Sequence, residues 1–503
     1  MDCRVEIPKV IDCELTLPQS KSIMTRALII NALAKNAVDY CDVDCCDDTL
    51  VMSRALSSGG DYIDVGAAGT AMRFLTAYFA CQEGRTVTID GTSRMRQRPI
   101  GPLVDALRQM GANIAYSGEK GYPPLKINGQ KLHGSALTMR GDVSSQFISA
   151  VLMISPLAGG ITLTLEGETV SRPYIDMTLA LMRHHGIEVH ENGKSIVVAE
   201  GHYAPSPFYI EGDWSAASYW FALKALLPQS HITLSPLLRD SIQGDCAIVE
   251  MMAPLGVTCD FVDDSVILST EDSIILSTDD SVILSTEDSV ILSTEDSVIL
   301  PPTPSILEGE LSAPSFCKAD KARLVPTLTQ ADKARLVPTL SQGVYVRDMV
   351  ATPDLVPTLA VTLCLLRVPF RLTGVAALRL KESNRLEALH EELAKLGYRI
   401  EVGDSTLCYD GNHHEIEGEV TLSSHVDHRI AMALSLAATR HKIVIKNAEV
   451  VSKSYPNWWE QLINAECRMQ NAECRMQNAE CGMRNAECGM RNAECGMRNA
   501  PTT

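Results

Sequence analysis

The feature that most constrains the fold is a pattern that recurs along the chain. A short polar or glycine-containing cluster stands directly before a helical run of apolar residues, as in residues 17–34 (LPQSKSIMTRALIINALA). Short β-branched runs, such as residues 87–89 and 161–165, lie between the helical runs. Because strands that alternate with helices build α/β domains, the pattern predicts an α/β protein.

The starts of the helical runs share a chemical property. Polar side chains cap helix starts, where free amide N–H groups and the positive end of the helix dipole also attract anions. Capping alone explains any single case, including residues 20–22. Seven further polar or cationic starts favour several helix N-termini directed at a polyanionic ligand. They lie at residues 67–70, 144–146, 171–174, 213, 353–354, 381–385 and 427–429.

The length and composition of the chain limit its number of domains and the classes of partner that it can bind. A chain of 503 residues is long enough for two or three domains. The net charge is −18, but residues 261–300 hold ten acidic residues and no lysine or arginine, so the remainder carries −8. Without a basic patch we expect no nucleic-acid binding. We expect no membrane contact and a cytoplasmic location, because no apolar run reaches about 18 residues and the N-terminal residues lack a signal-peptide pattern.

Cysteine does not indicate a metal site. The chain has 16 cysteines, five of them in a terminal repeat, and no CxxC motif with a matching second one. We therefore expect reduced thiols and no structural zinc.

Three tandem repeats stand apart from this pattern. The unit DSVILSTE recurs with period eight over residues 264–300, ADKARLVPTL occurs at 319–328 and 331–340, and NAECRMQ and its variants fill 464–500. The first could form strands, and the last a coiled coil, although glycine enters its later copies at about 1 kcal/mol each. Near-identical copies indicate recent expansion, so we expect low-complexity insertions without a catalytic role.

Eight motifs, in one order, resemble the family of 5-enolpyruvylshikimate-3-phosphate synthases, the 3-phosphoshikimate 1-carboxyvinyltransferases of chorismate and aromatic amino-acid biosynthesis. They are LPQSKSIMTRAL, AAGTAMRFL, RMRQRPIGPLVDAL, GDVSSQFISAVL, SRPYIDMTL, RLKESNRL, VDHRIAM and KSYPNWWEQL. The resemblance covers roughly residues 1–260 and 343–463. It implies two similar α/β domains, each of three βαβαββ units: residues 1–20 plus 214–463, interrupted by repeats at about 264–342, and residues 21–213. The tail at 464–503 lies outside both.

The resemblance implies transfer of the enolpyruvyl group of phosphoenolpyruvate to the 5-hydroxyl of shikimate 3-phosphate, by a monomer without a metal or organic cofactor. Asp354 is the expected base, Glu382 the expected acid, and Lys21 a further catalytic residue. The residues expected to bind phosphoenolpyruvate are Lys21, Gly69, Arg98, Gln146, Arg385, Arg429 and Lys453. Those expected to bind shikimate 3-phosphate are Lys21, Ser22, Arg26, Ser144, Ser145, Gln146, Ser171, Tyr174, Asp354 and Lys381.

Alternatives remain for single residues and for the whole chain. Asp354 alone reads as a helix cap, Glu382 as a first-turn carboxylate, and His428 as a structural, hydrogen-bonding histidine. The spacing of Lys381 and Arg385 predicts that they share one helical face. Asn384 replaces the aspartate usual in this family. A sister transferase acting on UDP-N-acetylglucosamine, and a non-catalytic homologue disrupted by repeats, are the competing functions.

Overall fold

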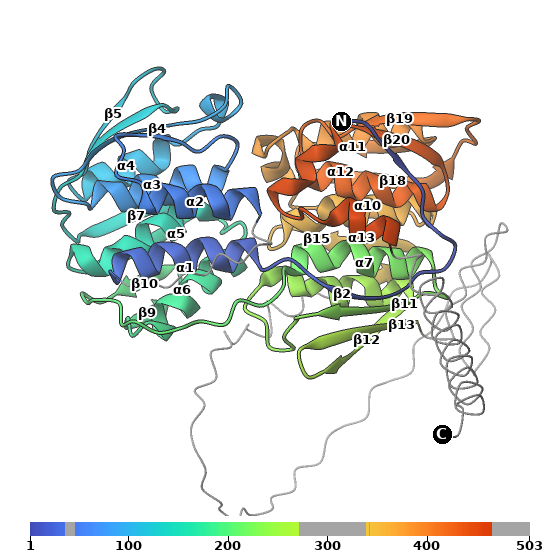
Figure 1. Cartoon of the computed structure of the whole chain (residues 1–503), viewed down its shortest axis with the longest axis horizontal. Coiled ribbons are helices and arrows are strands. Elements are labelled where there is room, and N and C mark those ends of the chain that lie inside the picture. The colour runs from blue at the N-terminus through green and yellow to red at the C-terminus, as the bar shows by residue number, and fades with distance from the viewer. Residues whose placement is uncertain (36–45, 271–338, 342, 465–503) are drawn as a thin grey trace, which may run out of the picture.

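The computed structural model describes residues 1–35, 46–270, 339–341 and 343–464, and it has two lobes with separate cores (Figure 1). In the continuous lobe the core residues lie between positions 23 and 210. In the split lobe they lie at 5–17 and 214–462. The chain crosses twice between the lobes, and the crossing segments run side by side: Gln19 and Gly212 form an antiparallel bridge.

Among its described residues, the continuous lobe contains two of the three βαβαββ units expected in each domain. In each, the first two strands are parallel, the fourth is antiparallel to the second, and the third lies at the edge. Helices α1 (Lys21–Leu33) and α2 (Asp47–Ser57) precede them. The units are β3 (Tyr62–Asp64), α3 (Gly69–Ala80), β4 (Thr86–Asp90), α4 (Gly101–Gln109), β5 (Asn113–Tyr116) and β6 (Leu125–Asn128), then β7 (Ala136–Arg140), α5 (Ser145–Ile154), β8 (Ile161–Glu166), α6 (Arg172–His184), β9 (Val189–Asn192) and β10 (Ser195–Val198).

The split lobe repeats this topology. Its first unit is β2 (Asp12–Thr16), α7 (Trp214–Leu226), β11 (His231–Ser235), α8 (Ile248–Met252), β12 (Val257–Val262) and β13 (Ser265–Thr270). Its second is β15 (Val344–Asp348), α10 (Val356–Leu365), β16 (Phe370–Thr373), α11 (Arg385–Lys395), β17 (Tyr398–Val402) and β18 (Thr406–His413), with β14 (Thr339–Ser341) added at the edge. The predicted α/β fold is confirmed, and the described residues show the expected βαβαββ topology in both lobes.

The third sheet of the split lobe joins the two ends of the lobe. Strands β19 (Glu419–Ser423) and β20 (Lys442–Lys446) are parallel and flank α12 (His428–Ser435), and α13 (Trp458–Asn464) follows. The last strand of this unit is β1 (Cys3–Val5), which pairs antiparallel with β20. The N-terminal residues therefore complete a sheet whose other strands come from the end of the lobe.

Short 3-10 helices connect these elements. They are η1 (Met95–Gln97), η2 (Ser155–Ala158), η3 (Gly244–Ala247), η4 (Ala253–Leu255), η5 (Pro353–Leu355), η6 (Ala376–Leu380), η7 (Leu436–Thr439) and η8 (Ala448–Lys453). Among the described residues, no helix has the length and apolar character needed to cross a bilayer.

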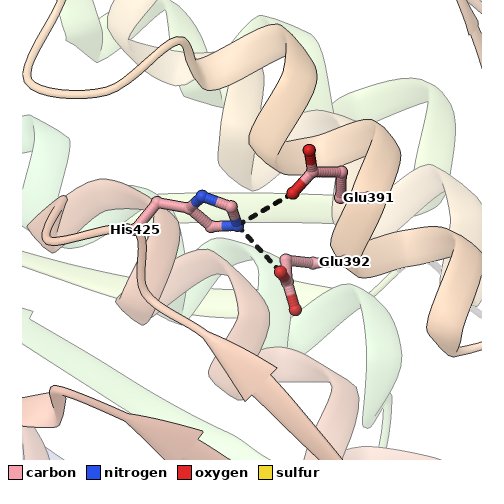
Figure 2. A group of neighbouring side chains, drawn as sticks. All are labelled: Glu391, Glu392 and His425. Carbon is pink, nitrogen blue, oxygen red and sulfur yellow. Dashed lines mark hydrogen bonds and ion pairs between the residues drawn. The ribbon is translucent and has the colours of Figure 1, made fainter.

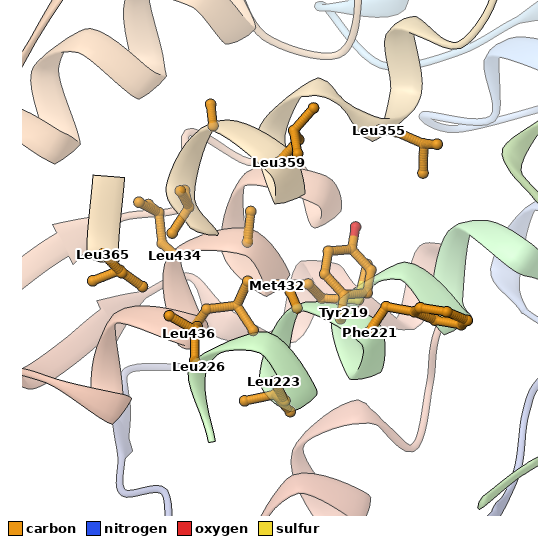
Figure 3. Packing of buried hydrophobic residues seen from close by; sticks show 14 of the residues in the cluster. Tyr219, Phe221, Leu223, Leu226, Leu355, Leu359, Leu365, Met432, Leu434 and Leu436 are labelled. Carbon is orange, nitrogen blue, oxygen red and sulfur yellow. The ribbon is translucent and has the colours of Figure 1, made fainter. Parts of the chain in front are cut away.

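The core of the split lobe is built around three enclosed helices. Every residue of α7, α10 and α12 is buried, as expected for a helix surrounded by other elements. Figure 3 shows Leu223, Leu359 and Met432, one from each helix, in the same cluster. Because their sides are buried, these helices can offer polar groups only at their ends. Just before α10, Asp354 contacts Tyr174 of the continuous lobe, as described below.

The predicted helix starts are confirmed where the structure shows side-chain caps. Ser20, Ser144, Asp213, Asn384 and Asp427 each accept a hydrogen bond from a backbone N–H in the first turn of the helix that follows. Asn384, which replaces the aspartate usual in this family, thus caps α11.

The first copy of the period-eight repeat is part of the fold. It forms β13, which pairs with both β11 and β12, and its Val266 and Leu268 are buried. The later copies, most of the 12-residue repeat and the tail from residue 465 lie outside the described residues.

Candidate active site

Asp354 lies at the start of the α10 segment, among three cations of its own lobe. Its Oδ1 is 3.1 Å from Lys381 Nζ and 2.9 Å from Arg385 Nη1, and its Oδ2 is 3.2 Å from Arg429 Nη2. Burial alone would raise the pKa of this carboxyl, but the three cations together hold it well below its usual range. Asp354 therefore lies in a charge cluster, and its carboxylate binds side chains instead of capping a helix.

Glu382 is a second carboxylate surrounded by cations, and these come from both lobes. Its Oε1 lies 2.9 Å from Lys453 Nζ and 3.5 Å from Arg98 Nη1, and its Oε2 lies 3.1 Å from Arg385 Nη2. Burial opposes ionisation, but Lys453, Arg98 and Arg385 hold the pKa of Glu382 well below its usual range. Both expected proton-transfer groups are thus ionised carboxylates held by the residues expected to bind the substrate anions.

Arg385 links the two carboxylates. Its side chain is 1% exposed and contacts Asp354, Glu382 and Asp427, with Nε 2.8 Å from Asp427 Oδ2. The prediction that Lys381 and Arg385 share a helical face is wrong, because α11 begins at Arg385 and Lys381 precedes it in extended conformation. The two cations nevertheless converge on the same oxygen of Asp354.

Lys21 brings a cation from the start of α1. Its Nζ lies 3.4 Å from Asp48 Oδ2. Burial works against the charged form, but the fields of Asp48, Cys46 and Glu382 outweigh it, so the pKa of Lys21 is raised. Lys21 is therefore protonated. It also lies close enough to Glu382 for the two charges to interact.

Gly69 and Arg98 meet at the start of α3. A Cβ built on Gly69 would lie 2.5 Å from Arg98 Nη1, closer than such contacts allow. The guanidinium is therefore held against a helix N-terminus, a position that favours an anion between them. Lys453 reaches the same region, since its Nζ donates to the Ala67 carbonyl at 2.9 Å across the lobes. These expected phosphoenolpyruvate ligands come together in the structure.

Tyr174 joins the continuous lobe to the Asp354 cluster. Its hydroxyl is 3.3 Å from Asp354 Oδ2 and 3.2 Å from Asp245 Oδ1. Ser171, with a left-handed φ of 56°, donates its backbone N–H to the Val350 carbonyl at 2.8 Å, again across the lobes. Tyr174 and Ser171, which were expected to bind shikimate 3-phosphate, thus lie at the contact between the lobes.

The α5 start places three more expected residues. Ser144 caps the helix, Ser145 is buried in its first turn, and the Gln146 amide donates to Thr70 Oγ1 at 3.0 Å. The starts of α3 and α5 are therefore linked by side chains.

Arg26 has a different environment from the one its expected role implies. Its guanidinium is buried and donates to Ser22 O at 2.7 Å, to Thr178 Oγ1 at 2.7 Å and to Tyr174 O at 3.1 Å. Burial lowers the pKa of Arg26 to about 10. In this structure Arg26 ties α1 to α6 by these bonds, and a contact with substrate remains a prediction.

Two residues beside the cluster were not predicted correctly from the sequence: His428 and Asp245. His428 was expected to form structural hydrogen bonds; that is wrong among the described residues, where neither ring nitrogen has a hydrogen-bond partner and Nδ1 lies 3.7 Å from Asp427 Oδ1. Burial, with Lys21 and Lys453 adding to it, lowers the pKa of His428 well below its usual range, so the ring is neutral. Asp245 was missed. It is buried, accepts from Tyr174 and Ser215, and burial raises its pKa to about 6.

Another ionisable group lies on α11 and the turn after β19 (Figure 2). His425 Nε2 is 2.8 Å from Glu392 Oε1 and 3.7 Å from Glu391 Oε2, a set of ligand types that can bind a metal ion. Glu392 is already engaged, however: Lys395 Nζ lies 2.8 and 2.7 Å from its two oxygens, and Ser423 N donates to Oε2 at 2.9 Å. We interpret the group as an anchor for the turn that leads into α12.

Comparison with known proteins identifies the family of this chain. A sequence profile of the EPSP synthase family (3-phosphoshikimate 1-carboxyvinyltransferase) matches residues 53–281 and 325–462, well over half of the chain. The chain belongs to the EPSP synthase family. All candidate residues except Lys21, Ser22 and Arg26 fall inside the two matched segments.

Relatives named as this enzyme match a larger share of the chain than the family profile does. The 3-phosphoshikimate 1-carboxyvinyltransferase of Bacteroides fragilis (strain YCH46) is 40% identical over 462 residues, which is 91% of this chain and 96% of that protein. The protein of the same name from Cellvibrio japonicus (strain Ueda107) is 32% identical over 475 residues, covering 88% and 94%.

Solved structures support the EPSP synthase fold. An EPSP synthase from Acinetobacter baumannii superposes with a TM-score of 0.60 at 19% identity, covering 92% of this chain and 98% of that one. The enolpyruvyl transferase NikO from Streptomyces tendae gives 0.61 at 13% identity, covering 92% and 96%.

Proposed function

We propose that this EPSP synthase family member transfers the enolpyruvyl group of phosphoenolpyruvate to the 5-hydroxyl of shikimate 3-phosphate and releases phosphate. One observation carries the proposal: Asp354 and Glu382 are ionised carboxylates enclosed by lysines and arginines at the contact between two lobes. Two substrates that each bear a phosphate and a carboxylate supply the anions that such a cation cluster binds.

The proposed reaction proceeds by addition and then elimination. Asp354 takes the proton of the 5-hydroxyl while that oxygen bonds to C2 of phosphoenolpyruvate, and Glu382 gives a proton to the methylene carbon C3. In the second step the C2–O bond to phosphate breaks, C3 returns a proton to the Glu382 carboxylate, and phosphate leaves with the proton that Asp354 had taken up. Atoms and charge balance without a redox step. Charge placement and orientation by the surrounding cations stabilise the adduct.

The cation cluster also suggests how substrate binding prepares the two carboxylates for proton transfer to and from the substrates. Without substrate, neighbouring cations hold both pKa values low. Substrate anions bound to Lys453, Arg98 and Arg385 would offset that positive field, so both pKa values would rise. Glu382 could then carry the proton that its role as an acid requires, and Asp354 would become a stronger base.

Further parts of the proposal concern organisation. We assign residues 1–20 plus 214–463, and 21–213, as the two domains, with Lys21 beside the first crossing. A monomer is proposed because residues from both lobes of one chain meet around Asp354 and Glu382. Phosphorylated metabolites as substrates fit a cytoplasmic location.

The test is phosphate release from phosphoenolpyruvate, with shikimate 3-phosphate and UDP-N-acetylglucosamine offered in separate reactions of the full chain. We expect turnover only with shikimate 3-phosphate. Turnover with the sugar nucleotide would replace the proposal with the sister activity, and silence with both acceptors would show a non-catalytic homologue.

A further inference from the structure

Arg94 is not among the expected site residues, but its side chain binds the backbone of two of them, Lys381 and Glu382. It precedes η1 in the continuous lobe, and its guanidinium crosses to the split lobe. There Nε donates to the Glu382 carbonyl at 3.0 Å and Nη2 donates to the Lys381 carbonyl at 3.3 Å. A single exposed side chain thus binds two consecutive peptide carbonyls in the other lobe.

A second arginine beside η1 also reaches Glu382. Arg98 follows Arg94 by four residues, on the far side of η1, and its Nη1 lies 3.5 Å from Glu382 Oε1. Arg94 therefore contacts the backbone of Glu382, and Arg98 contacts its carboxylate. Both contacts exist only while the two lobes are together.

The backbone that Arg94 holds carries two side chains of the proposed machinery. Lys381 and Glu382 lie in the connection between η6 and α11, with Lys381 in extended conformation. From this connection Lys381 reaches Asp354, and Glu382 reaches Lys453 and Arg385. Small displacements of a proton donor have large effects on rate, because reacting atoms must lie within hydrogen-bond reach.

We propose that Arg94 is a positioning residue for the acid group: by binding the Lys381 and Glu382 carbonyls across the lobes, it fixes the orientation in which Glu382 delivers its proton. Arg94 contacts no reacting atom in this role. The inference rests on the proposed function, since it assigns Glu382 as the acid.

Arg96, which lies within η1, supplies a matched control. Its Nε and Nη2 lie 2.9 and 2.6 Å from the oxygens of Asp90, within the continuous lobe. Arg96→Gln therefore removes the same charge, from a partly exposed side chain two residues away, with its hydrogen-bonding partner in its own lobe.

The experiment measures kcat, the KM of each substrate and Tm for Arg94→Gln, Arg94→Lys, Arg96→Gln and the wild type, all as full chains. For Arg94→Gln we expect kcat to fall about 10- to 100-fold, with the KM of shikimate 3-phosphate within twofold and Tm within about 2 °C. Arg94→Lys should recover part of kcat, because an ammonium can donate to one of the carbonyls. Arg96→Gln should stay within twofold of wild type.

Two outcomes would overturn the inference. One is an Arg94→Gln variant whose kcat equals that of Arg96→Gln. The other is a loss confined to KM, which would make Arg94 a contributor to lobe closure and substrate binding instead of acid positioning. A wild type that releases no phosphate would count against the proposed function itself, so the two failures are distinguishable.

Discussion

Gly69 and Arg98 are packed so closely that a methyl group on the glycine would lie 2.5 Å from Arg98 Nη1. Gly69→Ala should therefore push the guanidinium away from the start of α3. Because the displaced atoms are the end of a flexible side chain, we expect little change in Tm but a KM for phosphoenolpyruvate raised about tenfold or more. Steady-state kinetics with each substrate varied in turn would measure this.

The control for that substitution is Gly59→Ala, because a Cβ at Gly59 has nothing within 4 Å. It should leave both KM values unchanged. An unaltered KM for phosphoenolpyruvate in Gly69→Ala would mean that Arg98 is not a ligand of that substrate.

Asp354→Asn should lower kcat by about 10²- to 10⁴-fold, the range that general acid–base catalysis usually contributes. The amide keeps the shape of the carboxyl but cannot accept the 5-hydroxyl proton. Single-turnover phosphate release at saturating substrates would measure the loss.

Asp142→Asn is a suitable control for Asp354→Asn, since Asp142 pairs with Arg140 at the surface. It should retain wild-type kcat. A near-normal rate in Asp354→Asn would remove Asp354 from the role of base.

Asp245 makes stability depend on pH. Its folded pKa of about 6 lies above the ordinary 3.8, so the folded state binds a proton more tightly than the unfolded state. This contribution is fully present below about pH 4 and is lost as pH rises through about 6. Asp245→Asn mimics the protonated carboxyl at every pH, so it should stabilise the protein by about 2–3 kcal/mol at pH 7.5, from about two pKa units.

The measurement is Tm of the wild type and Asp245→Asn at pH 4.5 and 7.5. We expect a difference of about 2–4 °C at the higher pH, and a smaller one at pH 4.5. A difference that stays constant between the two values would show that Asp245 does not titrate in this range.

Strand β13 leads to a prediction about the repeat. Deleting residues 265–272 places Ser273 directly after Asp264, and residues 273–278 (SIILST) then offer the sequence of β13 with one change, Ile274 for Val266. One added methylene at a buried position typically costs about 1–3 kcal/mol. We therefore expect a folded protein with nearly unchanged phosphate release.

The contrasting variant lacks residues 265–300, so that no copy remains to pair with β11 and β12. It should be insoluble or lose several degrees in Tm, as thermal unfolding would show. A stable protein without any copy would mean that the sheet does not need this strand.

Local sequence predicted the helix starts well, because capping depends on residues close together in the chain. Ser20, Ser144 and Asp427 cap helices in the structure as the residue types indicated. The interpretation failed where a boundary moved: α11 begins at Arg385, so the four-residue spacing from Lys381 does not describe a helical face.

Contacts between the lobes could not be predicted from local pattern. Asp245 lies in η3, where no local motif marks it, and only the fold brings it within hydrogen-bonding distance of the Tyr174 hydroxyl, 71 residues away. Arg94 binds carbonyls 287 and 288 residues away, and backbone acceptors leave no trace in the side-chain sequence. The resemblance to a family supplied candidate residues, whereas the charges that surround each one became visible only in three dimensions.

The place of β1 affects the order in which the protein can be completed during synthesis. Domains generally fold as units while the chain emerges, and the continuous lobe has its core residues available once residue 210 has been made. Strand β1 is synthesised first, yet its partner β20 lies at Lys442–Lys446. The split lobe must therefore wait for almost the whole chain, and each copy added to the repeats lengthens that wait.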